Sequence, residues 1–287
     1  MPLASIPSPA HAAWRFGPVP VRAAQLCVVA GILVAVLVAE RRYRRAGGRP
    51  GIILDVAAWA VPFGLIAAVL HAALTDARHD ISHTDGIWPA ATACAGAIGV
   101  PGAIALGAAG AWVACRRAGV RLGPVAGAAA PALAFGLAVG GLGDWWAQQG
   151  YGPPSTWWWA VDISPANRVP GYENYATFTP AFGYRSLWEV ILGLAVIWAA
   201  RRFALSGERA FLLCAAGYAA GSFWIELIRI GPLPRALGLP YGAVGDIAVF
   251  FLAAAGMYLT RPGRKPPARV QVSPALVEDS SGDVMSM

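Results

Sequence analysis

Residues 23–49 read AAQLCVVAGILVAVLVAERRYRRAGGR, an apolar run that ends in a cluster of arginines. No charged residue occurs between Ala23 and Ala39, and about 20 apolar residues in a helix are enough to cross the hydrocarbon core of a bilayer. Arginines directly after such a run are typical of a helix that ends at the cytoplasmic face of a membrane. The stretch therefore predicts a transmembrane helix.

The composition of the whole chain also indicates lipid as the solvent. Of the 287 residues, 57% are hydrophobic and only 13% are charged, whereas soluble domains carry about 25% charged residues. The 34 glycines suit the close packing of membrane helices. The sequence predicts an all-α polytopic membrane protein of about seven transmembrane helices. These spans are expected near residues 20–40, 52–75, 88–115, 124–148, 186–200, 210–228 and 241–260.

Basic residues fall in every second connection between the predicted spans. Arginines cluster at 41–50, 116–121 and 201–209, and again beside Lys265 in the C-terminal tail, whereas aspartates dominate 76–87. Cytoplasmic loops are enriched in Lys and Arg, so the pattern predicts a multi-pass protein of the cell membrane with its N-terminus outside and its C-terminus in the cytoplasm. The net charge of +7 then needs no nucleic acid partner, because aromatic residues do not alternate with the arginines.

Two segments differ in character from the spans. Residues 149–185 are rich in proline and hold three consecutive tryptophans at 157–159, a residue type that is stable at the membrane interface. Long loops in compact proteins are often functional. The last residues are polar, which is typical of disorder. We expect one transmembrane domain over 1–265 with an outer loop at 149–185, and a disordered cytoplasmic tail at 266–287.

The cysteines predict neither disulfides nor a metal site. Cys27, Cys94, Cys115 and Cys214 lie in or at the edge of apolar runs, with no CxxC pair and no histidine cluster. Small buried thiols are the simpler interpretation. A Walker loop and a glycine-rich dinucleotide motif are also missing from the sequence, so we expect no metal and no cofactor.

Several short motifs follow one another in a characteristic order along the chain. They are Ser5-Ile-Pro-Ser-Pro9, Gly17-Pro-Val-Pro-Val-Arg22, Glu40-Arg-Arg-Tyr-Arg-Arg-Ala-Gly-Gly-Arg-Pro-Gly51, Trp59-Ala-Val-Pro-Phe-Gly64, Gly171-Tyr-Glu173, Ser186-Leu-Trp188 and Phe223-Trp-Ile-Glu226. With these motifs, over roughly residues 3–265, the chain resembles the prolipoprotein diacylglyceryl transferases, and most of all their actinobacterial type.

The resemblance implies a reaction and its substrates. The family transfers a diacylglyceryl group from phosphatidylglycerol to the thiol of a lipobox cysteine, and glycerol phosphate leaves. Such chemistry needs cations where negative charge develops on the phosphate, and a means to form the thiolate nucleophile. The implied partners are a phospholipid and the signal peptide of a prolipoprotein, within the membrane.

The chain departs from the family at the positions that serve this chemistry. In the signature that resembles G-R-x-G-N, Gly141 stands at the arginine position and Asp144 at the asparagine position. Gln149 replaces a glutamate, and Ser222 replaces a second arginine in the motif that ends at Glu226. Neither glycine nor serine offers the guanidinium fork that binds phosphate in two places.

Further family positions are changed as well. A motif similar to H-P-[ST]-x-L-Y-E reads Thr179-Pro-Ala-Phe-Gly-Tyr-Arg185 and so lacks both the histidine and the glutamate. The histidine-glycine-glycine element is best matched by Val100-Pro-Gly102, and Ala24 stands where a tyrosine is expected. These changes remove cations and hydrogen-bonding groups while the apolar pattern around them persists.

Two classes of function follow for this chain. One is a diacylglyceryl transferase of weak or lost activity, and the other is a non-catalytic paralogue that binds phospholipid or lipoprotein or partners an active homologue. Without the family arginines, the site is expected to be neutral to negative and to favour a neutral or zwitterionic lipid over an anionic one. Arg185 is a candidate substitute ligand for phosphate, with an interfacial anchor as the alternative, and Glu226 with Arg229 is also explained by a structural ion pair. No catalytic residue is assigned, and the predicted cavity residues are Gly141, Asp144, Gln149, Tyr218, Ser222 and Glu226.

Overall fold

The computed structural model describes residues 5–9, 13–16, 19–81, 102, 105–231, 235–236 and 238–260. Among them, five helical stretches are long and apolar enough to cross a membrane. They are α1 (Ala23–Arg45), α4 (Leu122–Gly141) continued by α5 (Gly143–Ala147), α6 (Ala181–Arg202), α7 (Gly207–Ile228) and α8 (Tyr241–Leu259). The helix α2 (Ile52–Ile81) and a helix over 105–117 complete the bundle. The chain is therefore an all-α polytopic membrane protein, as predicted.

The observed helix boundaries differ from the predicted spans at the start of α6 and at the end of α4. Helix α6 begins at Ala181, before the predicted start of 186, since Pro180 forms its N-cap and the polar residue Arg185 lies inside its first turns. The predicted span near 124–148 is interrupted at Leu142, where α4 ends and the short α5 begins. Residues 88–101 of the predicted third span, the tail at 266–287, Cys94, and the match at Val100 and Pro101 lie outside the described residues.

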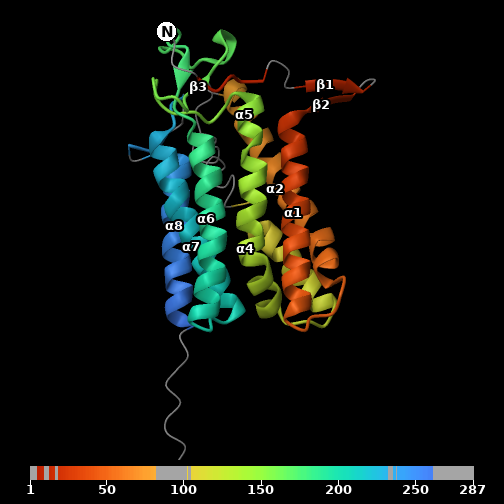
Figure 1. Cartoon of the computed structure of the whole chain (residues 1–287). Coiled ribbons are helices and arrows are strands. Elements are labelled where there is room, and N and C mark those ends of the chain that lie inside the picture. Colours follow the sequence, from red (N-terminus) through yellow and green to blue (C-terminus); the bar gives the residue numbers. More distant parts are fainter. Residues whose placement is uncertain are drawn as a thin grey trace, which may run out of the picture.

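Glycine contacts bring the helices of the bundle close together. Helix α4 packs on α1 as well as on α6 and α7, and α7 packs on α8 (Figure 1). A Cβ added at Gly31 would lie only 2.4 Å from the backbone oxygen of Gly136, and one at Gly136 would lie 2.7 Å from the backbone oxygen of Gly31. Only glycine permits this approach of α1 to α4. The small residues predicted for helix packing are thus used where two backbones touch.

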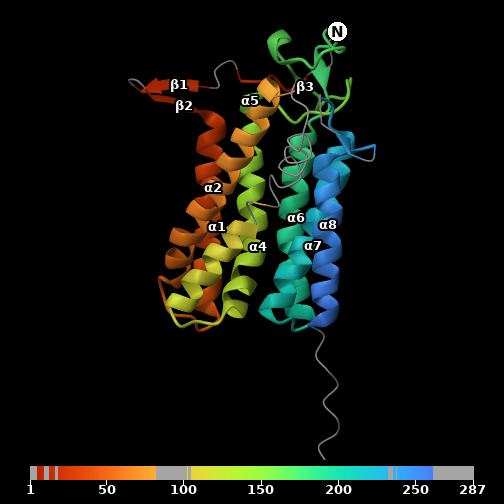
Figure 2. The ribbon, with the colours of Figure 1, turned by 180° about the vertical axis from the view of Figure 1, so that it is seen from behind.

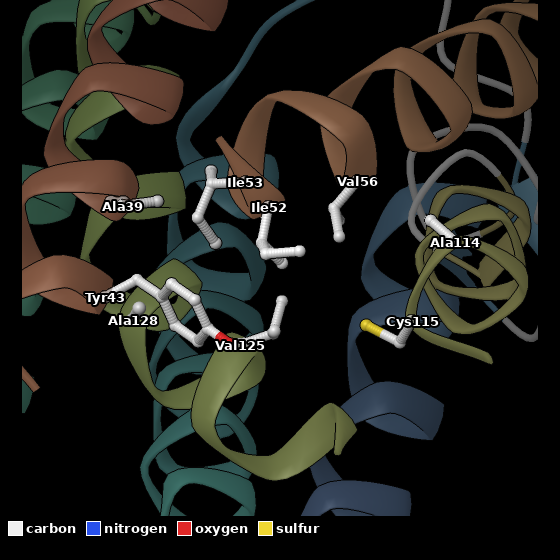
Figure 3. Close-up of a cluster of buried hydrophobic side chains, with 10 residues drawn as sticks. Ala39, Tyr43, Ile52, Ile53, Val56, Ala114, Cys115, Val125 and Ala128 are labelled. Carbon is white, nitrogen blue, oxygen red and sulfur yellow. The ribbon is translucent and has the colours of Figure 1, made fainter. Parts of the chain in front are cut away.

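The connections with many arginines gather at one end of the bundle. The turns after α1, after the 105–117 helix and after α6 all lie at this end, as the view from behind also shows (Figure 2). An apolar cluster above them joins four helices (Figure 3). Arg116 and Arg117 lie over the rings of Trp112 and Trp59, at 4.5 and 4.7 Å from the ring centroids. This end is the one for which the sequence predicts the cytoplasmic side.

The opposite end carries three short hairpins that the sequence did not predict. They pair β1 (Ala13–Phe16) with β2 (Val19–Arg22), β3 (Val161–Asp162) with β4 (Thr177–Phe178), and β5 (Arg235–Ala236) with β6 (Leu239–Pro240). The strands are too short for a period-two pattern to stand out in the sequence. In Figure 1 the hairpin of β1 and β2 lies above α1, whereas β3 lies with the long loop above α5 and α6.

The long loop has a small core of its own. Tyr151, Val161, Ile163, Phe178 and Phe182 are buried together. The Tyr151 hydroxyl donates to the Asn167 carbonyl at 2.6 Å and accepts from the Val169 amide at 2.9 Å, and burial raises the pKa of this phenol. The loop is therefore an ordered cap on this end of the bundle.

Candidate polar site at the loop end of the bundle

Polar side chains from α5, α6, α7 and α8 meet beneath the loop cap. On α7, Tyr218, Ser222 and Glu226 follow one another at four-residue spacing and so share one face of the helix. Asp246 of α8 and Glu189 of α6 are almost fully buried, with 4% and 2% of their surface exposed. Buried acids within apolar helices are costly and are usually paired or functional. We call Asp144, Arg185, Glu189, Tyr218, Ser222, Glu226, Arg229 and Asp246 the polar cluster.

Arg185 is at the centre of the polar cluster. Its Nη2 donates to the Tyr218 hydroxyl at 2.9 Å, and its Nε lies 3.4 Å from Oε1 of Glu189. It also interacts electrostatically with Asp144 and Glu226. The arginine therefore links α6 to α7 and is surrounded by carboxylates.

A second arginine lies nearer the cap. Nη1 of Arg229 is 2.8 Å from Oε1 of Glu226, in an ion pair at the end of α7. Arg229 also interacts electrostatically with Asp144, and Ser222 interacts with the carboxylate of Asp246. Each arginine of the polar cluster thus has acidic neighbours.

The polar cluster has more acids than bases. Arg185 and Arg229 face four carboxyl groups, those of Asp144, Glu189, Glu226 and Asp246, so the formal charge of the polar cluster is negative. Oε2 of Glu189 and Oδ2 of Asp246 are buried and accept no hydrogen bond from the described residues. These two carboxylate oxygens could accept hydrogen bonds from a ligand.

The structure brings most, but not all, of the predicted cavity residues together. Asp144, Tyr218, Ser222 and Glu226 belong to the polar cluster. Gly141 lies at its edge, where an added Cβ would meet the Ser186 hydroxyl at 3.1 Å.

Gln149 is separate from these contacts. It is exposed, and its backbone amide donates to the Asp144 carbonyl. The neighbouring Gln148 is buried instead and accepts from Ser164 and Asn167. In the described residues, Gln149 thus contacts the site through its backbone amide and not through its side chain.

Glu189 and Asp246 were not among the cavity residues predicted from the sequence. Both are acids inside long apolar helices, and that isolation is the signal that could have found them. No three His, Cys, Asp or Glu side chains are grouped to hold a metal ion among the residues that the structure describes.

A cavity of about 410 Å³ opens beside the ion pair of Glu226 and Arg229. Its wall comes from the end of α7, from the loop cap near Tyr172 and from the turn before α8. Of the predicted cavity residues, Glu226 is the one that lines it. The cavity therefore borders the polar cluster at Glu226 and Arg229.

Comparison with known proteins identifies the family of the chain. Residues 11–260 match the family model for prolipoprotein diacylglyceryl transferase. The chain is 41% identical to phosphatidylglycerol–prolipoprotein diacylglyceryl transferase 1 of Streptomyces coelicolor, over 99% of its own length and 81% of the relative. The chain belongs to the prolipoprotein diacylglyceryl transferase family.

Other members of the family give the same result. The chain is 38% identical to transferase 2 of Streptomyces coelicolor, over 94% of this chain and 86% of the relative. It is 37% identical to the transferase of Mycobacteroides abscessus, over 95% and 83% of the two chains. The resemblance seen in the sequence is confirmed over nearly the whole chain.

Family membership gives the polar cluster its context. Two of the positions at which the resemblance implies arginines are Gly141, beside Ser186, and Ser222, beside Asp246. The arginine that this chain does have, Arg185, stands where the resemblance implies a glutamate. Relative to the pattern of the prolipoprotein diacylglyceryl transferases, positive charge is therefore moved to α6 and surrounded by acids.

Proposed function

We propose that this chain binds phospholipid and the signal peptide of prolipoproteins at the polar cluster, and that its diacylglyceryl transfer is weak or lost. The observation that carries the proposal is the pairing of both cluster arginines. Arg185 contacts Glu189, and Arg229 contacts Glu226. A phosphate that entered the site would have to compete with a carboxylate for each guanidinium group.

The reaction makes strong demands on such cations. Transfer to a thiol leaves glycerol phosphate, and the charge that develops on it must meet donors that are already in place. Loss of one such donor typically lowers a rate by about 10²–10³. Gly141 and Ser222 stand at positions where the family has arginines, and the polar cluster is formally negative. The phosphate would therefore be stabilised poorly.

A second candidate is an active transferase with a rearranged site. The names of the relatives favour it, and Arg185 would then be the phosphate ligand, after release from Glu189. The paired geometry favours the first candidate. A non-catalytic member that partners an active one is compatible with the two relatives found in Streptomyces coelicolor, which show that members of the family can coexist in one organism.

The orientation is also proposed. Arginine-rich connections share one end of the bundle, and by the positive-inside rule this end faces the cytoplasm. The polar cluster and the loop cap then face outward in the cell membrane. This is the side on which an exported prolipoprotein would meet the site.

Complementation tests the proposal. A bacterium depleted of its own prolipoprotein diacylglyceryl transferase would receive the native chain, its Gly141→Arg/Ser222→Arg variant, or the first Streptomyces coelicolor relative. We expect growth with the relative and none with the native chain, at equal membrane levels on an immunoblot. Growth supported by the native chain would favour the rearranged transferase. Growth with the double variant but not with the native chain would identify the missing arginines as the cause of the lost activity.

A further inference from the structure

The cavity beside Glu226 and Arg229 presents opposite charges side by side. Nη1 of Arg229 and Oε1 of Glu226 are 2.8 Å apart, and both residues line the cavity. The Arg229 side chain is 28% exposed, whereas its Nε is buried without a hydrogen-bond partner among the described residues, so a ligand would reach the outer nitrogens of the guanidinium group. A ligand with both a phosphate and a nearby cation would match this pair without leaving either charge uncompensated.

The surroundings favour the cationic part of such a ligand. Glu226 lies within electrostatic reach of Asp246, and the polar cluster behind it has two arginines against four carboxyl groups. Glu226 lies in the last turn of α7, which itself has no basic residue and is followed by Arg229 at the C-cap. The carbonyl end of a helix attracts positive charge. The aromatic ring of Tyr172 on the cavity wall offers a further surface for a cation.

Apolar side chains continue from the cavity along the outside of the bundle. Leu227 lines the cavity and is 43% exposed, and Trp224, one turn earlier on α7, is 65% exposed. On a membrane helix such residues face acyl chains. A headgroup in the cavity would therefore have its fatty acids beside α7, within the membrane.

We propose that this cavity binds the headgroup of an amino-phospholipid, with the ammonium group on Glu226 and the phosphate on Arg229. The inference rests on the proposed phospholipid binding and names the lipid class. Phosphatidylethanolamine fits because its ammonium donates hydrogen bonds. Phosphatidylcholine has no such donor, and phosphatidylglycerol brings only negative charge to a formally negative cluster. Charge-assisted hydrogen bonds are the stronger ones, so the carboxylate should discriminate among the three lipids.

Binding of short-chain lipids to the full chain in detergent tests this inference. Dioctanoyl phosphatidylethanolamine, phosphatidylcholine and phosphatidylglycerol have the same acyl chains, so a difference in affinity by native mass spectrometry reports the headgroup. We expect phosphatidylethanolamine to bind at least about tenfold more tightly than the other two, as for one charge-assisted hydrogen bond. The Glu226→Gln variant should lose this preference. Glu208→Gln changes an exposed acid at the other end of α7 and should keep it.

Three results would overturn the inference. They are equal or tighter binding of phosphatidylglycerol, equal binding of phosphatidylcholine, and a preference that survives in Glu226→Gln. The comparison in the native chain needs no variant and so does not depend on the stability of any substitution. Transfer activity is judged separately: a native chain that prefers phosphatidylethanolamine yet modifies a lipobox cysteine refutes only the proposed loss of activity. A chain that prefers phosphatidylglycerol but transfers nothing refutes only this inference.

Discussion

Replacing Arg185 by methionine should destabilise the protein strongly. Its Nε lies 3.4 Å from Oε1 of Glu189, and the side chains of Arg185 and Glu189 are 22% and 3% exposed. At an effective dielectric constant of about 20, this separation corresponds to an attraction of about 5 kcal/mol. Removing one partner of a buried pair leaves the other charge uncompensated and typically costs about 3–5 kcal/mol. The Tyr218 hydroxyl also loses the donor at 2.9 Å.

Removing both charges is the matched control. Arg185→Met/Glu189→Leu keeps roughly the same volume and restores the native formal charge of the polar cluster. Replacement of a whole buried pair by apolar residues is often neutral or stabilising, so the double variant should be more stable than Arg185→Met alone by about 2–4 kcal/mol. Glu189→Leu alone reduces the excess of acids and should be the milder single substitution.

Unfolding in mixed micelles, followed by tryptophan fluorescence and far-ultraviolet circular dichroism, gives these free energies. The expected order of stability places Arg185→Met last. A variant Arg185→Met that unfolds like the native chain would refute the reasoning, and so would a double variant as unstable as Arg185→Met. Either result would mean that the ion pair does not compensate the buried Glu189.

Three further predictions concern the bundle, the cap and the topology. Gly136→Ala should destabilise by about 1–3 kcal/mol because its Cβ would lie 2.7 Å from a backbone oxygen of α1, whereas Gly140→Ala, with 3.9 Å to its nearest neighbour, should be neutral or gain up to about 1 kcal/mol in helix propensity; thermal unfolding in detergent compares them, and equal losses would contradict the close contact. Tyr151→Phe leaves the Asn167 carbonyl without its hydroxyl donor and should cost about 1–3 kcal/mol in the same assay, so an unchanged stability would count against the ordered cap. A cysteine at position 160, in a chain with its own cysteines replaced, should react with a membrane-impermeant maleimide in intact cells. Because native Ala160 is only 1% exposed, the loop must first be mildly unfolded. Labelling only from the cytoplasmic side would contradict the proposed orientation.

The lengths of the apolar runs predicted the fold well, because a helix that crosses the membrane needs about 20 apolar residues. Helices begin within a few residues of the predicted positions at Ala23, Ile52, Leu122, Gly207 and Tyr241. The start of α6 was predicted too late, since Arg185 breaks the apolar pattern while pairing inside the bundle. The three hairpins at the loop end of the bundle were not predicted, because strands of two to four residues are too short to show an alternating pattern in the sequence.

The candidate site was predicted in part for a similar reason. Spacing along α7 placed Tyr218, Ser222 and Glu226 on one face, and the structure brings them to one cluster. Pairing between helices is not visible in a single sequence, so the contact of Arg185 with Glu189 could not be derived from it. Asp246 meets the other acids only after α8 folds back on α7.

The most direct test of the account measures the transfer itself. The purified chain, reconstituted in phosphatidylglycerol vesicles with a synthetic lipobox peptide, would be compared by mass spectrometry with the first Streptomyces coelicolor relative at equal protein concentration. The account predicts that the diacylglyceryl mass appears on the peptide cysteine at least about a hundredfold more slowly than with the relative, because the phosphate lacks unpaired cations. A rate closer to that of the relative would contradict the proposed loss of activity.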